Sequence, residues 1–92
     1  MEGLVLEKDL LIQNEKGLHA RAAATFVKTL ENIDADVFVS RVGQTVQGDS
    51  IMGLMMLAAS KGATIHLRIE GKEAQKAMDV LTLLVNSKFG EE

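Results

Sequence analysis

Apolar and polar residues alternate along several segments in a pattern that predicts four strands. Segment 63–70 alternates strictly between one apolar and one polar face, which is typical of a strand buried on one side only. Segments 4–12 and 35–41 are also compatible with strands, and a turn around Gly43 joins the second of them to a short strand at 45–47. A strand with one polar face indicates a largely antiparallel sheet with one face in solvent.

Helical spacing of apolar residues predicts three helices. Segments 20–30 and 72–88 place apolar residues three and four positions apart, and the second should be the longest helix. Segment 51–59 follows the preferred N-cap residue Ser50, and we expect a basic last turn and a glycine at Lys61-Gly62 to end it. The apolar stripes of the two longer helices are Ala23, Phe26, Val27 and Leu30, and Ala74, Ala77, Met78, Leu81, Leu84 and Val85.

The order strand, helix, strand, strand, helix, strand, helix predicts one α+β domain over residues 1–92. We expect an open-faced β-sandwich, a four-stranded antiparallel sheet covered on one face by three helices. The 92 residues suit one compact core, and no internal repeat, proline-rich linker or low-complexity segment divides them.

Composition narrows the range of functions. The chain has no cysteine, which excludes a disulfide framework and a thiolate metal site. A net charge of -3 and 3% aromatic residues disfavour nucleic acid as a partner. No stretch approaches the roughly 20 apolar residues that span a bilayer, and no basic region precedes an apolar run at Met1. We therefore expect no membrane association and a cytoplasmic location.

The candidate chemistry lies in segment 17–23, where a glycine-ended loop delivers His19 immediately before the first predicted helix. Unpaired N–H groups and about half a unit of positive charge make the first turn of a helix an anion site. Imidazole, with an unperturbed pKa of about 6.5, offers a nucleophilic nitrogen near neutral pH without a general base. Arg21 can supply the planar fork that binds phosphate oxygens.

Other interpretations of these residues are simpler. His19 can be only a helix-start residue, and Arg21 only a solvated charge. His66 lies on the polar face of segment 63–70, and we expect it to be a solvated strand residue. Two histidines without cysteine do not meet the ligand count of a zinc site, so we expect neither metal nor cofactor. A small ligand-binding regulatory domain stays open as an alternative. An independent enzyme is disfavoured, because the sequence has neither paired carboxylates nor a Walker-type loop.

Four segments in the same order resemble the HPr family, the histidine-containing phosphocarriers of the bacterial phosphoenolpyruvate-dependent phosphotransferase system. They are Gly17-Leu18-His19-Ala20-Arg21, Asp34-Ala35-Asp36-Val37, Ser50-Ile51-Met52-Gly53-Leu54-Met55 and Ala59-Ser60-Lys61-Gly62-Ala63. The resemblance covers essentially the whole chain. The fold of that family, four antiparallel strands and three helices in an open-faced sandwich, agrees with the element order.

The resemblance implies a role for each residue of the first motif. His19 would accept phosphate at its pros nitrogen, Nδ1, from enzyme I, with phosphoenolpyruvate as the ultimate donor, and pass it to an EIIA-type protein. Arg21 would stabilise the phosphate. The family motif usually continues with proline where this chain has Ala22, which restores a backbone N–H and loosens the constraint on φ in the first helical turn. We expect phosphate binding to survive and transfer rates to change.

The resemblance also implies regulatory and docking roles for the second helix. Ser50 is similar to the serine that HPr kinase/phosphorylase modifies, and it is also a preferred N-cap. Ile51, Met52 and Met55 resemble the exposed apolar residues with which HPr docks its partners, although a Met-rich helix is more often core by spacing alone. We expect Leu54 and Leu57 to be the core residues of this helix.

The chain is also similar to NPr, the nitrogen-branch relative of HPr. Met56-Leu57 and Asn86-Ser87-Lys88-Phe89-Gly90 resemble NPr, whereas Ile51-Met52-Gly53 favours the sugar-type protein. Both branches share the histidine chemistry, and the choice between them stays open. We expect the carrier to be a monomer. The intact His19 and Arg21 speak against a carrier-derived regulator that has lost transfer and acts only through Ser50.

Overall fold

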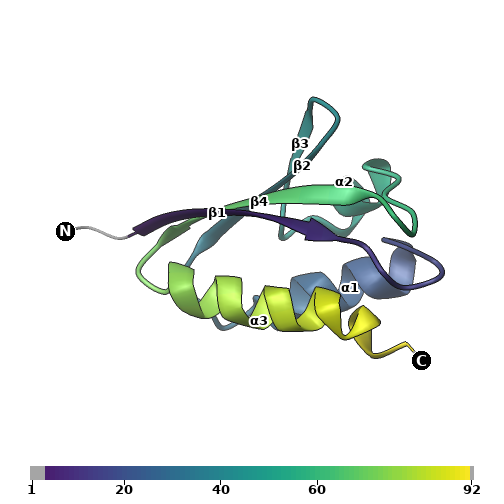
Figure 1. The fold of residues 1–92 in the computed structure, drawn as a ribbon. Helices are drawn as coiled ribbons and strands as arrows, with labels where there is room; N and C mark the ends of the chain where they lie inside the picture. Colours follow the sequence, from purple (N-terminus) through teal and green to yellow (C-terminus); the bar gives the residue numbers. More distant parts are fainter. Residues whose placement is uncertain (1–3, 92) are drawn as a thin grey trace.

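The protein is described by a computed structural model that covers residues 4–91, and its four strands and three helices follow the order that the sequence predicts (Figure 1). The structure also has a short 3-10 helix after the last α-helix, which the sequence does not predict. The elements are β1 (Leu4–Leu11), α1 (Ala20–Thr29), β2 (Asp36–Arg41), β3 (Gln44–Gln47), α2 (Ile51–Met56), β4 (Thr64–Gly71), α3 (Ala74–Asn86) and η1 (Lys88–Gly90).

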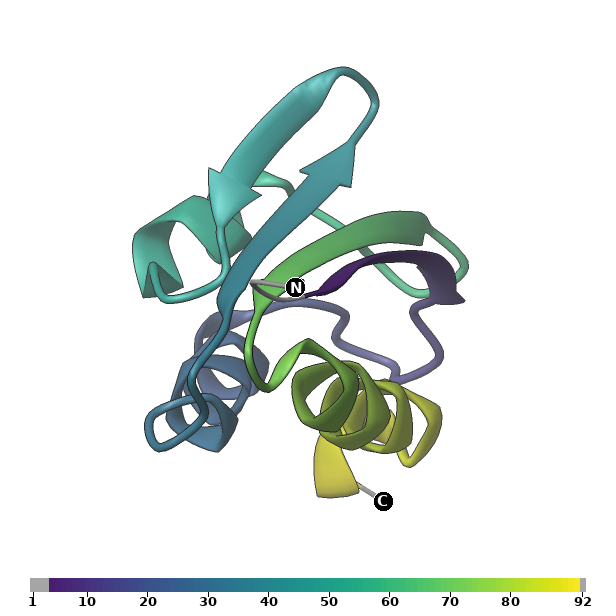
Figure 2. The ribbon, with the colours of Figure 1, turned by 90° about the vertical axis from the view of Figure 1, so that its left-hand side faces the viewer.

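The strands form one antiparallel sheet in the order β1, β4, β2, β3. Ile65, Leu67 and Ile69 of β4 are fully buried, as the alternation predicts. Figure 2 shows α1 and α3 side by side against this face of the sheet, whereas no helix within residues 4–91 covers the other face. The predicted α+β fold, an open-faced β-sandwich, is therefore confirmed.

The core lies between the sheet and the helices. Phe26 of α1 and Leu81 of α3 are fully buried, and Leu54 of α2 and its C-cap residue Leu57 add to the core, as predicted. Burying a large apolar side chain contributes about 1.5–3 kcal/mol, so these side chains fix each helix on the sheet. α2 contacts α1 and the edge strand β3, which places it at one side of the two long helices (Figure 2).

The second helix is shorter than its sequence suggests. α2 ends at Met56, and Ala58 adopts a left-handed backbone conformation with φ of 52°. The chain leaves the helix here because the carbonyl of Ala59 accepts a hydrogen bond from the amide of Leu18 at 2.8 Å. The prediction that Lys61-Gly62 closes this helix is wrong, since Lys61 lies in a later turn, where its Nζ pairs with Glu15 at 2.5 Å.

A left-handed turn follows the longest helix. α3 spans 13 residues and ends at Asn86, before the predicted boundary at Lys88. Lys88, Phe89 and Gly90 then have φ values of 58°, 57° and 73°. A residue with a Cβ in this conformation costs roughly 1–2 kcal/mol, and burial of the Phe89 ring offsets part of that cost. The turn brings the end of the described chain under the start of α1 (Figure 1).

Candidate functional site

The loop before α1 is fixed by a contact that only glycine allows. Gly17 has φ of 66°, and a Cβ at this position would lie 2.4 Å from the carbonyl oxygen of Ala59. Leu18 follows as a buried anchor, and its amide donates to Ala59. The backbone of His19 is thereby held at the start of the helix.

His19 is the N-cap residue of α1. Its carbonyl oxygen accepts the amide hydrogen of Ala23 at 2.8 Å, and its Nδ1 atom accepts that of Arg21 at 3.3 Å. A ring nitrogen that accepts a hydrogen bond carries no proton, so the Nδ1 lone pair is directed at the unpaired amides of the first turn. The side chain is 27% exposed, which leaves the ring accessible to a reactant.

The second ring nitrogen of His19 contacts a carboxylate from the other end of the chain. Nε2 lies 2.6 Å from Oε2 of Glu91, and Oε1 of the same carboxylate accepts a hydrogen bond from Nδ2 of Asn14 at 2.9 Å. Asn14 is fully buried and also donates to the carbonyl of Gly17 at 2.9 Å. Neither Asn14 nor Glu91 is predicted from the sequence, and the motif around His19 contains no signal for Glu91.

Charges around the ring keep the Glu91 carboxyl ionised. Burial raises its pKa, but hydrogen bonds from Asn14 and His19, together with the positive charge of Arg21, outweigh burial and hold the pKa below its usual value. Arg21 is exposed, and its guanidinium group makes no hydrogen bond or ion pair within residues 4–91. This cation is therefore available to an anion at the start of α1.

Ala22 occupies the third position of α1, where the family has proline. Its side chain is fully buried, and its N–H is among the first four amides that a helix leaves without an intrahelical partner. The chain thus offers one more donor at the start of the helix than a proline would.

The residues predicted for regulation and docking lie at and beyond the start of α2. Ser50 is the N-cap, and its Oγ accepts the amide hydrogen of Gly53 at 2.9 Å, which confirms the predicted cap. Ile51, Met52 and Met55 have exposed side chains, with Met52 reaching 70%. Met56 of the same helix, which was not predicted as a docking residue, is also exposed.

His66 is placed differently from expectation. It lies on the polar face of β4 as predicted, but it is paired rather than simply solvated. Its Nδ1 lies 2.7 Å from Asp9 and its Nε2 lies 2.7 Å from Glu7, both on β1. The hydrogen bond with Asp9, followed by that with Glu7, raises the pKa of His66. Within residues 4–91, no group of three or more His, Cys, Asp or Glu side chains is placed to hold a metal ion.

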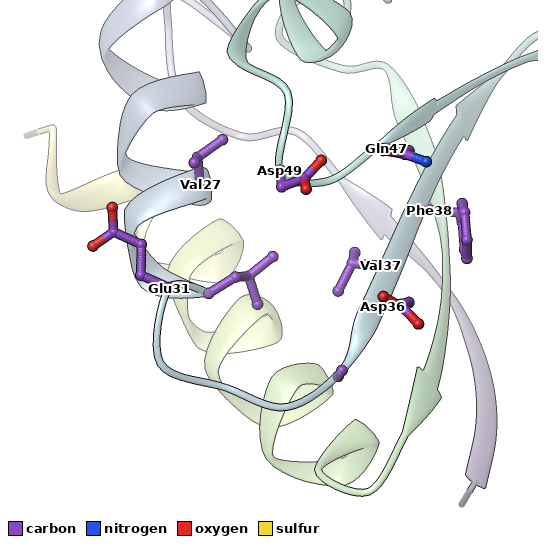
Figure 3. A pocket seen from close by; sticks show the side chains of 9 residues that line it. Val27, Glu31, Asp36, Val37, Phe38, Gln47 and Asp49 are labelled. Atoms are coloured by element: carbon purple, nitrogen blue, oxygen red, sulfur yellow. The ribbon is translucent and has the colours of Figure 1, made fainter.

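A pocket of about 270 Å³ lies away from His19, between α1, β2 and the segment before α2 (Figure 3). Its lining contains the acidic residues Glu31, Asp36 and Asp49 and no basic residue, a composition that disfavours an anionic ligand. None of the predicted site residues lines it. No helix within residues 4–91 combines the length and the hydrophobicity needed to cross a bilayer.

An open-faced sandwich that presents an accessible histidine over the amides of its first helix has the architecture of a histidine phosphocarrier. Residues 6–87 match the family described as "PTS HPr component phosphorylation site". The chain therefore belongs to the HPr family of the phosphotransferase system.

Individual relatives agree in sequence and in fold. The phosphocarrier protein HPr of Cupriavidus necator is 45% identical, over 95% of this chain and 98% of that protein. A crystal structure of HPr from Thermoanaerobacter tengcongensis has a TM-score of 0.90 at 40% identity and covers 95% of this chain and 98% of its own. A structure described as an HPr dimer from the same organism has a TM-score of 0.75 at 40% identity, over 89% of this chain and 94% of its own.

Proposed function

We propose that this protein is a phosphocarrier in which Nδ1 of His19 accepts a phosphoryl group and passes it to another protein. One observation carries the proposal: Nδ1 of an accessible ring accepts a hydrogen bond from the Arg21 amide at the start of α1. The nucleophilic nitrogen thus lies directly beside an anion site.

The reaction needs positioning and charge rather than a general base. The Nδ1 lone pair attacks phosphorus in line with the leaving group, and the three phosphoryl oxygens turn towards the amides of Arg21 and Ala22 and the positive end of α1. The free guanidinium group of Arg21 can reach the same oxygens and compensate their charge as the bond forms. We assign Arg21 to phosphate stabilisation on this basis.

Membership of the HPr family supports a particular set of partners. Enzyme I is the proposed donor, with phosphoenolpyruvate as the ultimate source, and EIIA-type proteins are the proposed acceptors. Ile51, Met52 and Met55 form the proposed docking surface, because flexible thioether side chains can fit several partners. A monomeric carrier in the cytoplasm would meet donor and acceptor in turn.

Ser50 is proposed as the regulatory site for an HPr kinase/phosphorylase. Its hydroxyl lies at the N-terminus of α2, where a phosphoserine would be tolerated by the unpaired amides. The same charge would stand beside the exposed apolar residues of α2 and oppose their desolvation in a complex. Phosphorylation of Ser50 should therefore weaken docking without unfolding the helix.

Phosphoryl acceptance can be tested directly with phosphoenolpyruvate and enzyme I. The expected product carries one phosphate that is labile to acid and stable to base, and tandem mass spectrometry should assign it to His19. A stable phosphate ester on a hydroxyl side chain, or no incorporation under conditions that phosphorylate a known HPr, would contradict the proposal.

A further inference from the structure

The carboxylate of Glu91 occupies the edge of the His19 ring opposite to Nδ1, at 2.6 Å from Nε2. We propose that Glu91 is a positioning residue that holds the proton of His19 on Nε2, directs phosphorylation to Nδ1, and stabilises the positive charge that the ring acquires. This inference rests on the proposed phosphocarrier function and adds a specific residue to its site.

The hydrogen bonds of His19 fit only one neutral tautomer. An ionised carboxylate can only accept, so the proton on the Glu91 side belongs to Nε2. The amide of Arg21 can only donate, so Nδ1 must have a free lone pair. The two contacts, one from each end of the chain, therefore select the same tautomer and fix the orientation of the ring.

A buried hydrogen-bond partner and a left-handed turn hold the Glu91 carboxylate in its position. Asn14, which is fully buried, holds Oε1 at 2.9 Å, and the left-handed turn at Lys88–Gly90 directs the chain towards α1. The buried ring of Phe89 anchors that turn. Glu91 itself is only 17% exposed, and its lowered pKa keeps it charged at neutral pH. A chance surface contact would not combine a buried amide partner with a conformationally costly turn.

The charge balance of the transfer step gives this contact a chemical role. As the Nδ1–P bond forms, the bond from phosphorus to the leaving group breaks and its electron pair departs with that group. Nε2 keeps its proton, so the neutral ring becomes a cation. A carboxylate at hydrogen-bond distance stabilises this cation, in the same way that a buried aspartate stabilises the imidazolium of a serine protease.

Repulsion between Glu91 and the incoming phosphoryl group acts in the opposite direction. The full width of the imidazole ring separates the carboxylate from phosphorus, whereas the cation that it stabilises is in direct contact with it. The amides of the α1 start and the guanidinium of Arg21 also lie on the phosphoryl side and reduce that repulsion. We therefore expect net acceleration by Glu91.

Glu91→Ala and Glu91→Gln test the proposal, with Glu31→Gln as the matched control. Glu31 is exposed and lies beyond the far end of α1, about 15 Å from the helix start. Phosphoramidate serves as the donor: its P–N bond breaks, ammonia leaves, and no protein partner is needed. Nitrogen-15 NMR of the imidazole ring reports the tautomer, and phosphorus-31 NMR reports which nitrogen carries phosphate.

The expected result has three parts. The wild type and Glu31→Gln should show the Nε2–H tautomer and phosphate on Nδ1 alone. Both Glu91 variants should show a mixture of tautomers, some phosphate on Nε2, and a rate lower by about tenfold, as expected for loss of a partly screened hydrogen bond to a charged group. An unchanged tautomer, exclusive Nδ1 phosphorylation or an equal or faster rate in these variants overturns the proposal.

The two proposals fail in different ways. If enzyme I does not phosphorylate the wild type, the phosphocarrier function is wrong, whatever the ring does with phosphoramidate. If the wild type is phosphorylated and the Glu91 variants behave like Glu31→Gln, only the role of Glu91 is wrong. Thermal unfolding of each variant, followed by circular dichroism, establishes that the fold is intact in every comparison.

Discussion

His19 and His66 are the same side chain in two regions of one molecule, and their ring nitrogens face different groups. His19 has one carboxylate and one backbone amide, so a proton on Nε2 and a lone pair on Nδ1 satisfy both neighbours. His66 has a carboxylate at each nitrogen, and two acceptors are satisfied only by a ring that carries two protons.

This difference decides which histidine can be a nucleophile. The protonated ring favoured at His66 has no lone pair to give, although the side chain is 40% exposed and lies on the open face of the sheet. His19 is less exposed, but it keeps one nitrogen free beside an anion site. The proposed reactivity of His19 therefore follows from its hydrogen-bond partners rather than from its exposure.

The largest expected effect comes from exchanging each histidine in turn. His19→Ala should abolish phosphorylation by enzyme I and phosphoenolpyruvate, because Nδ1 of His19 is the proposed attacking atom. His66→Ala should retain the wild-type rate within about twofold, since a remote surface substitution changes little. Radiolabelled phosphate incorporation measures both, and phosphate retained in His19→Ala would contradict the assignment.

Gly17→Ala should damage the region around His19 and leave the surroundings of His66 intact. A Cβ 2.4 Å from the Ala59 carbonyl and a φ of 66° force the loop to move. We expect a loss of about 2–4 kcal/mol in the free energy of unfolding. Urea denaturation measures the loss. The NMR titration of His66 in the same variant is the control, and it should remain unchanged.

Neutralising both partners of His66 should bring it closer to a reactive histidine. In the double variant Glu7→Gln, Asp9→Asn, uncharged amide groups replace the two carboxylates whose hydrogen bonds raise the pKa of His66. The titration midpoint should fall towards the value of about 6.5 for free imidazole, and phosphoramidate should then modify His66 faster near pH 7. Proton NMR and mass spectrometry measure the two effects. A midpoint equal to that of the wild type would contradict this account.

The smallest effect is the pH dependence of stability. The folded pKa of His66 lies above its unfolded value, so the contribution of this pair of contacts is complete below about pH 6.5 and is lost as pH rises through the raised pKa. Because the groups are exposed, we expect less than about 1 kcal/mol. Urea unfolding between pH 5 and 9 should show a decline that is weaker in His66→Gln. An identical decline in both proteins would assign it to other groups.

Local patterns were sufficient for much of this molecule. The alternation at Ile65, Leu67 and Ile69 predicted which face of β4 is buried, and Ser50 predicted the start of α2. The place of His19 at the start of α1 could be predicted because a helix start imposes the same requirements on its residues in any fold, whereas the roles proposed for His19 and Arg21 also drew on the resemblance to HPr. Features that depend on neighbouring residues in the sequence could therefore be predicted.

Features that depend on contacts between residues distant in the sequence could not be predicted. Glu91 contacts His19 although the two residues are 72 positions apart in the sequence. The contact depends on a left-handed turn that Lys88 and Phe89 do not favour, so the residue types in this segment do not predict it. The partners of His66 follow from the register of β1 with β4, where Asp9 faces His66. The early end of α2 follows from the contact between Leu18 and Ala59. In each case tertiary structure overrides or supplements the local signal.

The sheet order has a consequence for biosynthesis. Among the strands of the described residues, β1 pairs only with β4, so it has no partner until residues 64–71 have left the ribosome, and the carboxylate beside His19 follows later still. Contacts so distant in sequence form slowly, because a long loop must close before they stabilise anything. A nascent chain therefore exposes the histidine motif before Glu91 is present to orient the ring, and the proposed site is complete only after residue 91 has been synthesised.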